Sequence, residues 1–436
     1  MDPITIALLT IAGVFALVLA GVHIGVSLAL LSVAGIWAIT GKSGVAISLL
    51  NTTAYSSVMD YIFAVIPLFV LMGILANLAG ATRDLFSSAQ VLFGRIRGGL
   101  GIATVIANAV FAAITGVSVA SAAVFSKLAI PEMMRLQYNR KFAYGIVAGS
   151  AILGMLIPPS ILMIVYGVLT EQSIGKLFAA GIGPGLLVST ILALGIWLRV
   201  RLDPTIAPMT DAGHITRADL LRAAVKPWGV VLLIALVLGG LYGGLFTPTE
   251  AGAIGAAGAL VLAFAARKVN VRSATDVLMD IGRSTASIFL LLIAAQMYSR
   301  MLTISGLASS LSEWAAALQV PGMVIVLAFV VVFLMLGMII DSVSILLLTI
   351  PIMFPVMVKL GYDPIWFGMV AIIAIEIGLL TPPFGMVPFA MKASMGRGTS
   401  IEEIFAGSFP FMLLLLIALG IIIAVPSLST WLPSVL

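Results

Sequence analysis

Two polar interruptions within long apolar stretches carry most of the side chains suited to cation binding. The first, ITGVSVAS, covers residues 114–121, and the second, MIIDSVSI, covers residues 338–345. Their hydroxyl and carboxyl groups belong to Thr115, Ser118 and Ser121 in the first and to Asp341, Ser342 and Ser344 in the second. Several neutral oxygens with one anionic oxygen suit a hard cation such as Na+. The residue types therefore favour sodium binding at both interruptions.

A pair of adjacent prolines follows each interruption, inside another apolar stretch. Pro158–Pro159 lies in GMLIPPS and Pro382–Pro383 in GLLTPPF. Proline has no N–H and cannot donate to the carbonyl four residues earlier in a helix. The expected free carbonyls are those of Gly154 and Met155 in the first pair and Gly378 and Leu379 in the second. Such carbonyls are tolerated at membrane depth only where protein, water or an ion satisfies them.

These two features together predict two sodium sites and a facing substrate site. The first sodium site is expected at Thr115, Gly116, Ser118, Gly154, Met155 and Pro158, and the second at Asp341, Ser342, Ser344, Gly378, Leu379 and Thr381. Half-helix N-termini beyond the breaks carry positive partial charge and suit an anionic substrate. The candidate substrate contacts are Ser118, Ser160, Ser342, Thr381, Pro159 and Pro383.

Several of these polar residues also have a simpler structural interpretation. Ser121 and Ser344 are either ligands or helix caps. Asp341 is a ligand, a cap or an ion-pair partner, although carboxylates within a membrane are usually functional. Glu376, two residues before Gly378, either pairs with Lys127 or lines a cavity. Neither His23 nor His214 is assigned a role.

The composition is that of a membrane protein. Hydrophobic residues make up 62% of the 436 residues, charged residues only 9%, and the mean hydropathy is +1.24. A soluble domain carries far more charge. The absence of cysteine excludes disulfides and thiol catalysis. The net charge of +5 is attributed to cytoplasmic loops and not to nucleic-acid binding.

The hydropathy pattern predicts an all-α polytopic protein with about ten spans and two re-entrant hairpins. The spans are expected at 4–21, 23–40, 60–80, 141–169, 175–200, 227–246, 249–267, 284–302, 364–391 and 404–426. The stretches 98–131 and 322–355 are interpreted as hairpins, because each arm of about 16 residues extends roughly 24 Å and is short for a crossing. The apolar run after residue 3 is expected to remain as a span and not to be a cleaved leader.

The basic residues predict the orientation. Of the 22 Lys and Arg residues, only Lys42, Lys176, Arg300 and Lys359 fall outside when the N-terminus is placed outside, and Lys127 lies in a hairpin arm. All others fall in inner loops, as the positive-inside rule requires. Both termini are therefore expected on the outer side of the membrane.

The chain repeats itself at a shift of 224 residues, the difference between positions 118 and 342. This shift aligns PEMMRLQY with PVMVKLGY and the two proline pairs with each other, without a gap. Amphipathic stretches 83–96 and 307–320 precede the two hairpins and are expected to lie in the membrane interface. Five spans separate the proline pairs, so the repeats are expected to be inverted, an arrangement typical of secondary transporters.

Several longer stretches resemble the large membrane (DctM-type) subunit of tripartite ATP-independent periplasmic (TRAP) transporters. They are GLYGGLFTPTEAGAIGA (240–256), ITGVSVASAA (114–123), LGMLIPPSILMIVYG (153–167) and GLLTPPFGM (378–386). The resemblance covers essentially the whole chain. It implies uptake of an organic acid anion, such as a C4-dicarboxylate, sugar acid, keto acid or sialic acid, driven by at least two Na+ ions across the bacterial inner membrane.

The resemblance also implies partners and moving parts. The expected partners are a separate small four-helix membrane subunit and a periplasmic substrate-binding protein. In an elevator mechanism, the transport domain corresponds to 98–201 and 322–436, the scaffold to 1–80 and 202–302, and the linking arms to 83–96 and 307–320.

Three other functions are compatible with parts of the sequence. One is a Na+-coupled carrier of the same superfamily that works without a binding protein. Another is an intramembrane hydrolase that uses a hairpin serine with Asp341, although no catalytic base is evident. The third is a scaffold subunit that transports nothing, which the two matched polar interruptions disfavour. No P-loop, Gly-x-Ser-x-Gly or His-Glu-x-x-His motif is present.

Overall fold

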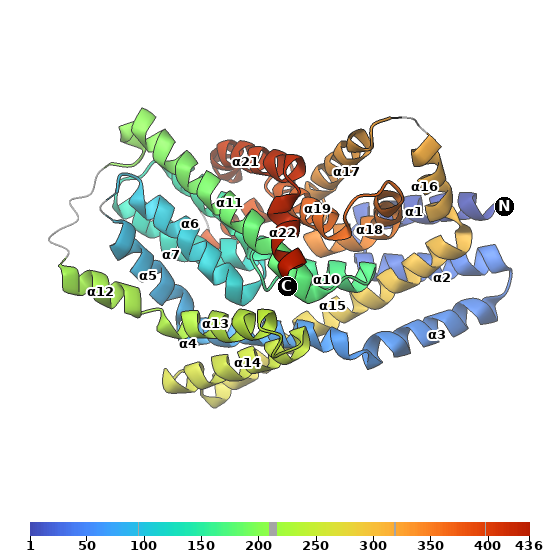
Figure 1. Ribbon diagram of the computed structural model, residues 1–436, viewed down its shortest axis with the longest axis horizontal. Coiled ribbons are helices and arrows are strands. Elements are labelled where there is room, and N and C mark those ends of the chain that lie inside the picture. The colour runs from blue at the N-terminus through green and yellow to red at the C-terminus, as the bar shows by residue number, and fades with distance from the viewer. Residues whose placement is uncertain (95, 209–215, 318–319, 397) are drawn as a thin grey trace.

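The fold is entirely helical in the part of the chain that the computed structural model describes, namely residues 1–94, 96–208, 216–317, 320–396 and 398–436. Figure 1 shows long helices packed side by side along an elongated molecule. This confirms the all-α prediction. Arg95, His214 and Arg397 lie outside the described residues.

The helices of the first half are α1 Pro3–Leu19, α2 Ile24–Thr40, α3 Ser43–Met59, α4 Val65–Ala79, α5 Ala81–Phe93, α6 Gly99–Thr115, α7 Ser118–Arg135, α8 Arg140–Ala151, α9 Leu153–Leu156, α10 Ile161–Thr170 and α11 Ile174–Leu202. Those of the second half are α12 Arg217–Val225, α13 Trp228–Tyr242, α14 Pro248–Ala265, α15 Val271–Ser305, α16 Leu307–Ala317, α17 Gly322–Gly337, α18 Ser342–Lys359, α19 Pro364–Gly378, α20 Met386–Met395, α21 Ile401–Ala424 and α22 Ser427–Val435. Short 3₁₀ turns lie at Tyr61–Ala64 and Pro204–Ile206.

Seven helical segments in the described part of the chain are long and apolar enough to cross a membrane. They are Tyr61–Ala79, Arg140–Thr170, Ile174–Leu202, Pro248–Ala265, Val271–Ser305, Ser342–Lys359 and Ile401–Ala424. Counting α12 and α13, which bend by 41° at their junction, as one span raises the number to eight. The protein is therefore a multi-pass membrane protein. Three of the ten predicted spans correspond to shorter apolar helices, namely α1, α2 and α19.

Some helices differ from their predicted lengths. α15 has 35 residues and extends well beyond the predicted 284–302. α7 and α18 have 18 residues each, about 27 Å, and are longer than the hairpin arms predicted from the hydropathy pattern. α3 and α22 were not predicted as helices. The sequence obscures α3 because Asn51, Thr52 and Thr53 dilute its hydropathy.

The polar residues of α3 are used in packing against the long α15. The Ser57 hydroxyl donates to the side-chain oxygen of Gln296 at 3.0 Å, and Thr53 is buried. α1, α2 and α3 lie beside α15 at one end of the molecule, and α4 packs against α14. The polar residues of α3 are thus accommodated because most of its hydroxyls donate to carbonyls of α3 itself and Ser57 also meets Gln296 of α15.

The helix bounds recur at the shift seen in the sequence. Adding 224 to the bounds of α7 gives those of α18, and the same shift places α6 on α17, α8 on α19 and α10 on α20 to within a few residues. The arm stretches correspond to α5 and α16, although residues 95, 318 and 319 of the predicted arms lie outside the described part.

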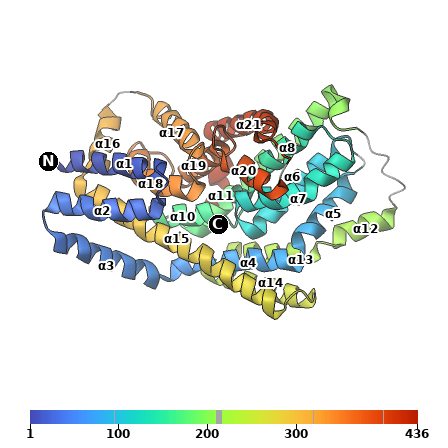
Figure 2. The ribbon, with the colours of Figure 1, turned by 180° about the vertical axis from the view of Figure 1, so that it is seen from behind.

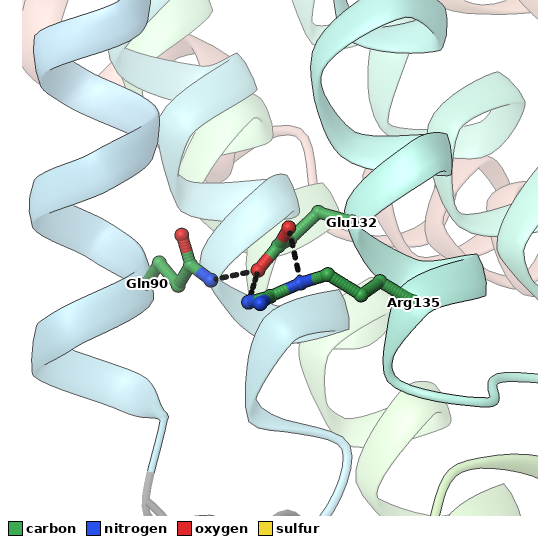
Figure 3. Close-up of polar contacts among 3 residues, drawn as sticks. All are labelled: Gln90, Glu132 and Arg135. Carbon is green, nitrogen blue, oxygen red and sulfur yellow. Dashed lines mark hydrogen bonds and ion pairs between the residues drawn. The ribbon is translucent and has the colours of Figure 1, made fainter.

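α5 is held by polar contacts at both of its ends. Near its start, the Lys226 ammonium lies 3.1 Å from the Asp84 carboxylate. Near its end, the Gln90 amide donates to the Glu132 carboxylate of α7 at 2.8 Å, and Arg135 donates to the same carboxylate (Figure 3). Figure 2 shows α5 between α12 and α7. α5 therefore joins the α12–α13 connector to α7.

Contacts join segments that the orientation prediction places on the same side. Arg140 and Glu403, both predicted inside, lie 3.9 Å apart. On the other side, the Tyr166 hydroxyl donates to the Pro364 carbonyl at 2.6 Å. The packing is thus compatible with the predicted orientation, which itself stays a prediction.

Small residues allow α8 and α21 to approach closely. A Cβ atom on Gly407 would collide with the Lys141 carbonyl, and a Cβ on Gly145 would collide with the Gly407 carbonyl. Close approach at small residues is a common way to pack helices within a bilayer. By contrast, Gly420 on the same α21 has nothing within 4 Å of the position of an added Cβ.

Replacing Gly407 with alanine is expected to lower the stability by about 1–3 kcal/mol, because the added methyl forces the two backbones apart. Gly420→Ala is the matched control and should leave stability unchanged or slightly raised, since alanine favours the helix. Thermal unfolding of the purified protein in detergent measures both. Equal melting temperatures for the two variants would contradict the close packing of α8 and α21.

Candidate functional site

The first polar interruption forms the corner between α6 and α7. α6 ends at Gly116, whose φ of +62° is the left-handed conformation that favours glycine at a helix C-terminus. α7 then begins at Ser118. The backbone of Thr115 presses on α4, since a Cβ on Gly73 would lie 3.1 Å from the Thr115 Cα. The corner is therefore held in place by the turn at Gly116 and by the contact of Thr115 with α4.

The first proline break meets this corner directly. A Cβ on Gly154 would lie 2.9 Å from the backbone N of Ser118, and one on Gly116 would lie 2.6 Å from the Pro159 carbonyl oxygen. The Ile161 N–H donates to the Gly116 carbonyl at 3.5 Å. The structure thus brings together the glycine and serine that the sequence places in the first sodium site.

The carbonyls opposite the prolines are less free than expected. The Met155 carbonyl accepts from the Ser160 hydroxyl at 2.5 Å. In the second break, the Gly378 carbonyl accepts from the Thr381 N–H at 2.9 Å and the Leu379 carbonyl from the Val387 N–H at 3.3 Å. The expectation of bare carbonyls is wrong for these three, because the chain turns back and supplies new donors. Each carbonyl keeps a second lone pair, so cation binding is not prevented.

The second interruption forms the corner between α17 and α18. Asp341 caps α18, and its carboxylate accepts from the Ser344 N–H at 3.0 Å and from the Ser344 hydroxyl. Gly337 and Gly378 touch through their backbones, since a Cβ on Gly337 would lie 2.6 Å from the Gly378 Cα. The second break therefore also meets a hairpin corner, while Asp341 and Ser344 contact each other.

The two breaks differ in exposure. Pro158, Pro159 and Ser160 are buried, whereas Pro382 and Pro383 are exposed together with Phe384. The half-buried Thr381 donates its hydroxyl to the Ile377 carbonyl at 3.0 Å. Of the six predicted substrate contacts, Pro383 is exposed and Thr381 half-buried, and Ser118, Pro159, Ser160 and Ser342 are buried.

Glu376 is the residue that joins the two corners. Its side chain is fully buried, and its two carboxylate oxygens accept from the hydroxyls of Ser118 and Ser342, the latter at 2.7 Å. These serines are the first residues of α7 and α18 and occupy equivalent positions in the repeat. The alternative pairing of Glu376 with Lys127 is wrong, because the Lys127 side chain is exposed and Glu376 faces the serines.

The electrostatics of this cluster are unusual. A buried carboxylate costs several kcal/mol unless charge and hydrogen bonds compensate it. The ion pairs among the described residues join Glu132 to Arg135, Arg140 to Glu403 and Asp84 to Lys226, so none reaches Glu376. Two neutral hydroxyls are its hydrogen-bond partners there. The site therefore has the character of a receptor for a cation or a proton.

The hydroxyl of Ser118 has a choice of acceptors. It also lies 3.5 Å from the Ile152 carbonyl, but a hydroxyl has only one proton to donate. The bond to the carboxylate is the stronger one. Under the 224-residue shift Ile152 corresponds to Glu376, so the first repeat offers a main-chain oxygen where the second offers a carboxylate.

A multi-pass helical protein whose interrupted helices meet at buried oxygen ligands has the construction of a secondary transporter. The family described as "Tripartite ATP-independent periplasmic transporter, DctM component" matches residues 11–428. The chain belongs to this family. It is accordingly a transporter component and not an enzyme.

Two relatives and one solved structure illustrate the similarity. The C4-dicarboxylate TRAP transporter large permease protein DctM of Pseudomonas aeruginosa is 35% identical over 394 residues, which cover 89% of each chain. The sialic acid TRAP transporter large permease protein SiaM of Vibrio cholerae is 29% identical over 97% of each chain. The crystal structure of the Alcanivorax borkumensis YdaH transporter matches with a TM-score of 0.57 at 18% identity, covering 87% of this chain and 88% of that chain, which shows a shared fold.

Removing either serine hydroxyl from Glu376 should destabilise the protein. We expect Ser118→Ala and Ser342→Ala each to cost about 1.5–3 kcal/mol, the usual contribution of a hydrogen bond to a charged group. Ser126→Ala is the matched control, because Ser126 is a buried serine of α7 whose hydroxyl has no partner among the described residues. Thermal unfolding in sodium-free detergent compares them. A loss no larger than that of Ser126→Ala would contradict the bonds to Glu376.

Proposed function

We propose that the chain is the large permease of a TRAP transporter that couples uptake of an organic acid anion to Na+. The observation that carries this proposal is the buried Glu376 carboxylate, which receives hydroxyls from both helix corners and no cationic side chain in the described part of the chain. A coupling cation at this cluster supplies the missing positive charge. The names of the relatives support the substrate class, because they include C4-dicarboxylate and sialic acid.

The sodium ions would occupy the junctions between corners and breaks. The first involves Ser118 and the Gly154 carbonyl, whose backbones lie in contact. The second involves Asp341, Ser344 and the Gly378 carbonyl, with Ser342 leading to Glu376. All these proposed ligands are oxygen atoms, which hard cations prefer. We add Glu376 to both sites as the shared source of negative charge.

The substrate would bind beside the exposed second break. Pro383 and Thr381 lie at its surface, and the N-terminus of α20 follows immediately at Met386. A helix N-terminus carries positive partial charge and attracts carboxylate groups. Ser118, Pro159, Ser160 and Ser342 are buried, so direct contact with them requires the corners to separate.

We further propose an inverted repeat and an elevator movement. The bounds of α5–α8, α10 and α11 agree to within a few residues with those of α16–α21 at the 224-residue shift, which supports the repeat. α5, bonded to Lys226 at one end and to Glu132 at the other, has the connections expected of an arm between a scaffold (1–80 and 202–302) and a transport domain (98–201 and 322–436). α16 would be the second arm.

The proposed setting is the bacterial inner membrane with both termini periplasmic. The partners are a small four-helix membrane subunit and a periplasmic binding protein for the anion. The family description, which names this chain as one component of a tripartite system, supports such an assembly.

Transport by the complete assembly tests the proposal. Liposomes holding the chain and its partners should accumulate a C4-dicarboxylate or sialic acid only under an inward Na+ gradient. Uptake by the chain without a binding protein would instead favour a Na+-coupled carrier that needs no binding protein. Modification by a serine-directed probe without any transport would favour a hydrolase.

Asp341→Ala combined with Ser118→Ala should lower Na+-driven uptake at least tenfold, because each change removes a proposed ligand. The matched control combines Asp363→Ala with Ser126→Ala. Asp363 caps α19 just as Asp341 caps α18, accepting from the Trp366 N–H at 2.8 Å, and lies outside the proposed sites. Initial uptake rates are normalised to the inserted protein. Equal uptake rates for the two double variants would contradict the assignment of the sodium sites.

A further inference from the structure

A cavity lies between α5 and α12, and none of the residues that line it belongs to the serine corners. Its volume is about 1110 Å³, and its walls include Ser87 and Ser88 of α5, Arg222 of α12, and Lys226 and Trp228 at the start of α13. Small-molecule pockets usually measure about 300–1,000 Å³. The cavity is therefore large enough for a substantial ligand, and the proposed transport of anions makes no use of it.

The basic groups of the cavity have spare capacity to bind an anion. The Lys226 ammonium, which has three N–H donors, lies 3.1 Å from Asp84 and donates to the Ser87 hydroxyl at 2.7 Å. That leaves one donor. The exposed Arg222 is not among the ion pairs of the described residues. The Asp219 carboxylate, in turn, accepts from the N–H and hydroxyl of Thr216 at 2.9 and 2.6 Å.

Two carboxylates beside the basic groups weaken the electrostatic attraction of the cavity for an anion but do not abolish it. Asp219 stays ionised, because hydrogen bonds from Thr216 lower its pKa. Asp84 is paired with Lys226. Lys226 and Arg222 therefore face two carboxylates, each of which already has its own donors. A phosphate adds acceptors for the remaining N–H donors of Lys226 and Arg222.

A second cavity adjoins the first. It has a volume of about 260 Å³ and shares Lys226 and Trp228 with the first cavity. Its other walls come mainly from alanines and leucines of α4, α13 and α14, including Ala76, Leu233 and Leu262. Two adjoining cavities with largely apolar walls and the basic Lys226 and Arg222 beside them match a molecule with a charged head and a hydrocarbon tail.

The residues around the cavity are of the types found at the depth of the lipid headgroups in a membrane. Trp228 is 59% exposed at the first residue of α13, and Leu221 is 68% exposed on α12 next to basic Arg222. Exposed tryptophan and basic residues at the end of an apolar helix are typical of the membrane interface. Basic pockets between helices at that depth bind the headgroups of anionic lipids.

We propose that this cavity binds an anionic phospholipid, with its phosphate at Arg222 and Lys226 and an acyl chain along the adjoining cavity. The lipid bridges α5 and the α12–α13 connector, the two elements that Lys226 already joins. Binding therefore stabilises the attachment of α5 to the connector.

Lipid binding to the purified full chain in detergent tests this site without any transport. Native mass spectrometry compares phosphatidylglycerol with phosphatidylcholine of identical acyl chains, and glycerol 3-phosphate serves as the free phosphate. The wild type should bind phosphatidylglycerol at least about fivefold more tightly, given roughly 1 kcal/mol for each basic residue near an anionic lipid. Equal affinity for both lipids would overturn the proposal, as would full competition by equimolar glycerol 3-phosphate.

Variants locate the site. Arg222→Gln should remove most of the preference for phosphatidylglycerol. The control, Arg217→Gln, removes an exposed arginine of the same helix and should keep the preference. Val91→Phe fills the cavity without changing charge and should also abolish the preference, which provides an independent test if the arginine variant fails to fold. Retained preference in a folded cavity variant would contradict the assignment.

Discussion

One buried carboxylate ties together the two helix corners on which the site depends. Glu376 accepts from Ser118 and from Ser342, which begin α7 and α18. A buried carboxylate without a cationic partner costs free energy, and separating it from its hydrogen-bond donors costs more. The corners can therefore separate only if Glu376 is neutralised or acquires another partner. Under the proposed function, a cation that enters the cluster would change this balance and link ion binding to the position of both corners.

The two stretches related by the 224-residue shift have similar helix bounds but differ in chemistry. Most of their helices begin and end within a few residues of one another at this shift, yet Glu376 corresponds to Ile152, and the buried Pro158–Pro159 corresponds to the exposed Pro382–Pro383. The first break is thus closed by packing, while the second reaches the surface. Both carboxylates near the corners, Asp341 and Glu376, lie on the second of the two stretches, and so does the exposed break.

The sequence predicted the fold class, the two corners and the breaks, because paired prolines interrupt a helix and hydroxyl residues within apolar runs need polar partners. It did not predict the role of Glu376, since its partners lie 258 and 34 residues away and only packing reveals them. It placed bare carbonyls where Thr381 and Val387 in fact donate. It also missed α3, whose hydroxyls lower its hydropathy although Thr53 bonds with the Leu49 carbonyl of α3 and Ser57 with the Thr53 carbonyl and with Gln296.

Equilibrium binding of radioactive Na+ to the purified protein measures directly whether Glu376 serves a cation. The Glu376→Gln variant keeps the size of the side chain and can still bond with both serines, but it loses the negative charge. We predict that this variant binds at least one Na+ fewer per chain than the wild type, with an unchanged helical content. Equal Na+ binding by the two proteins would show that the carboxylate only fastens the corners together and would contradict its role in ion coupling.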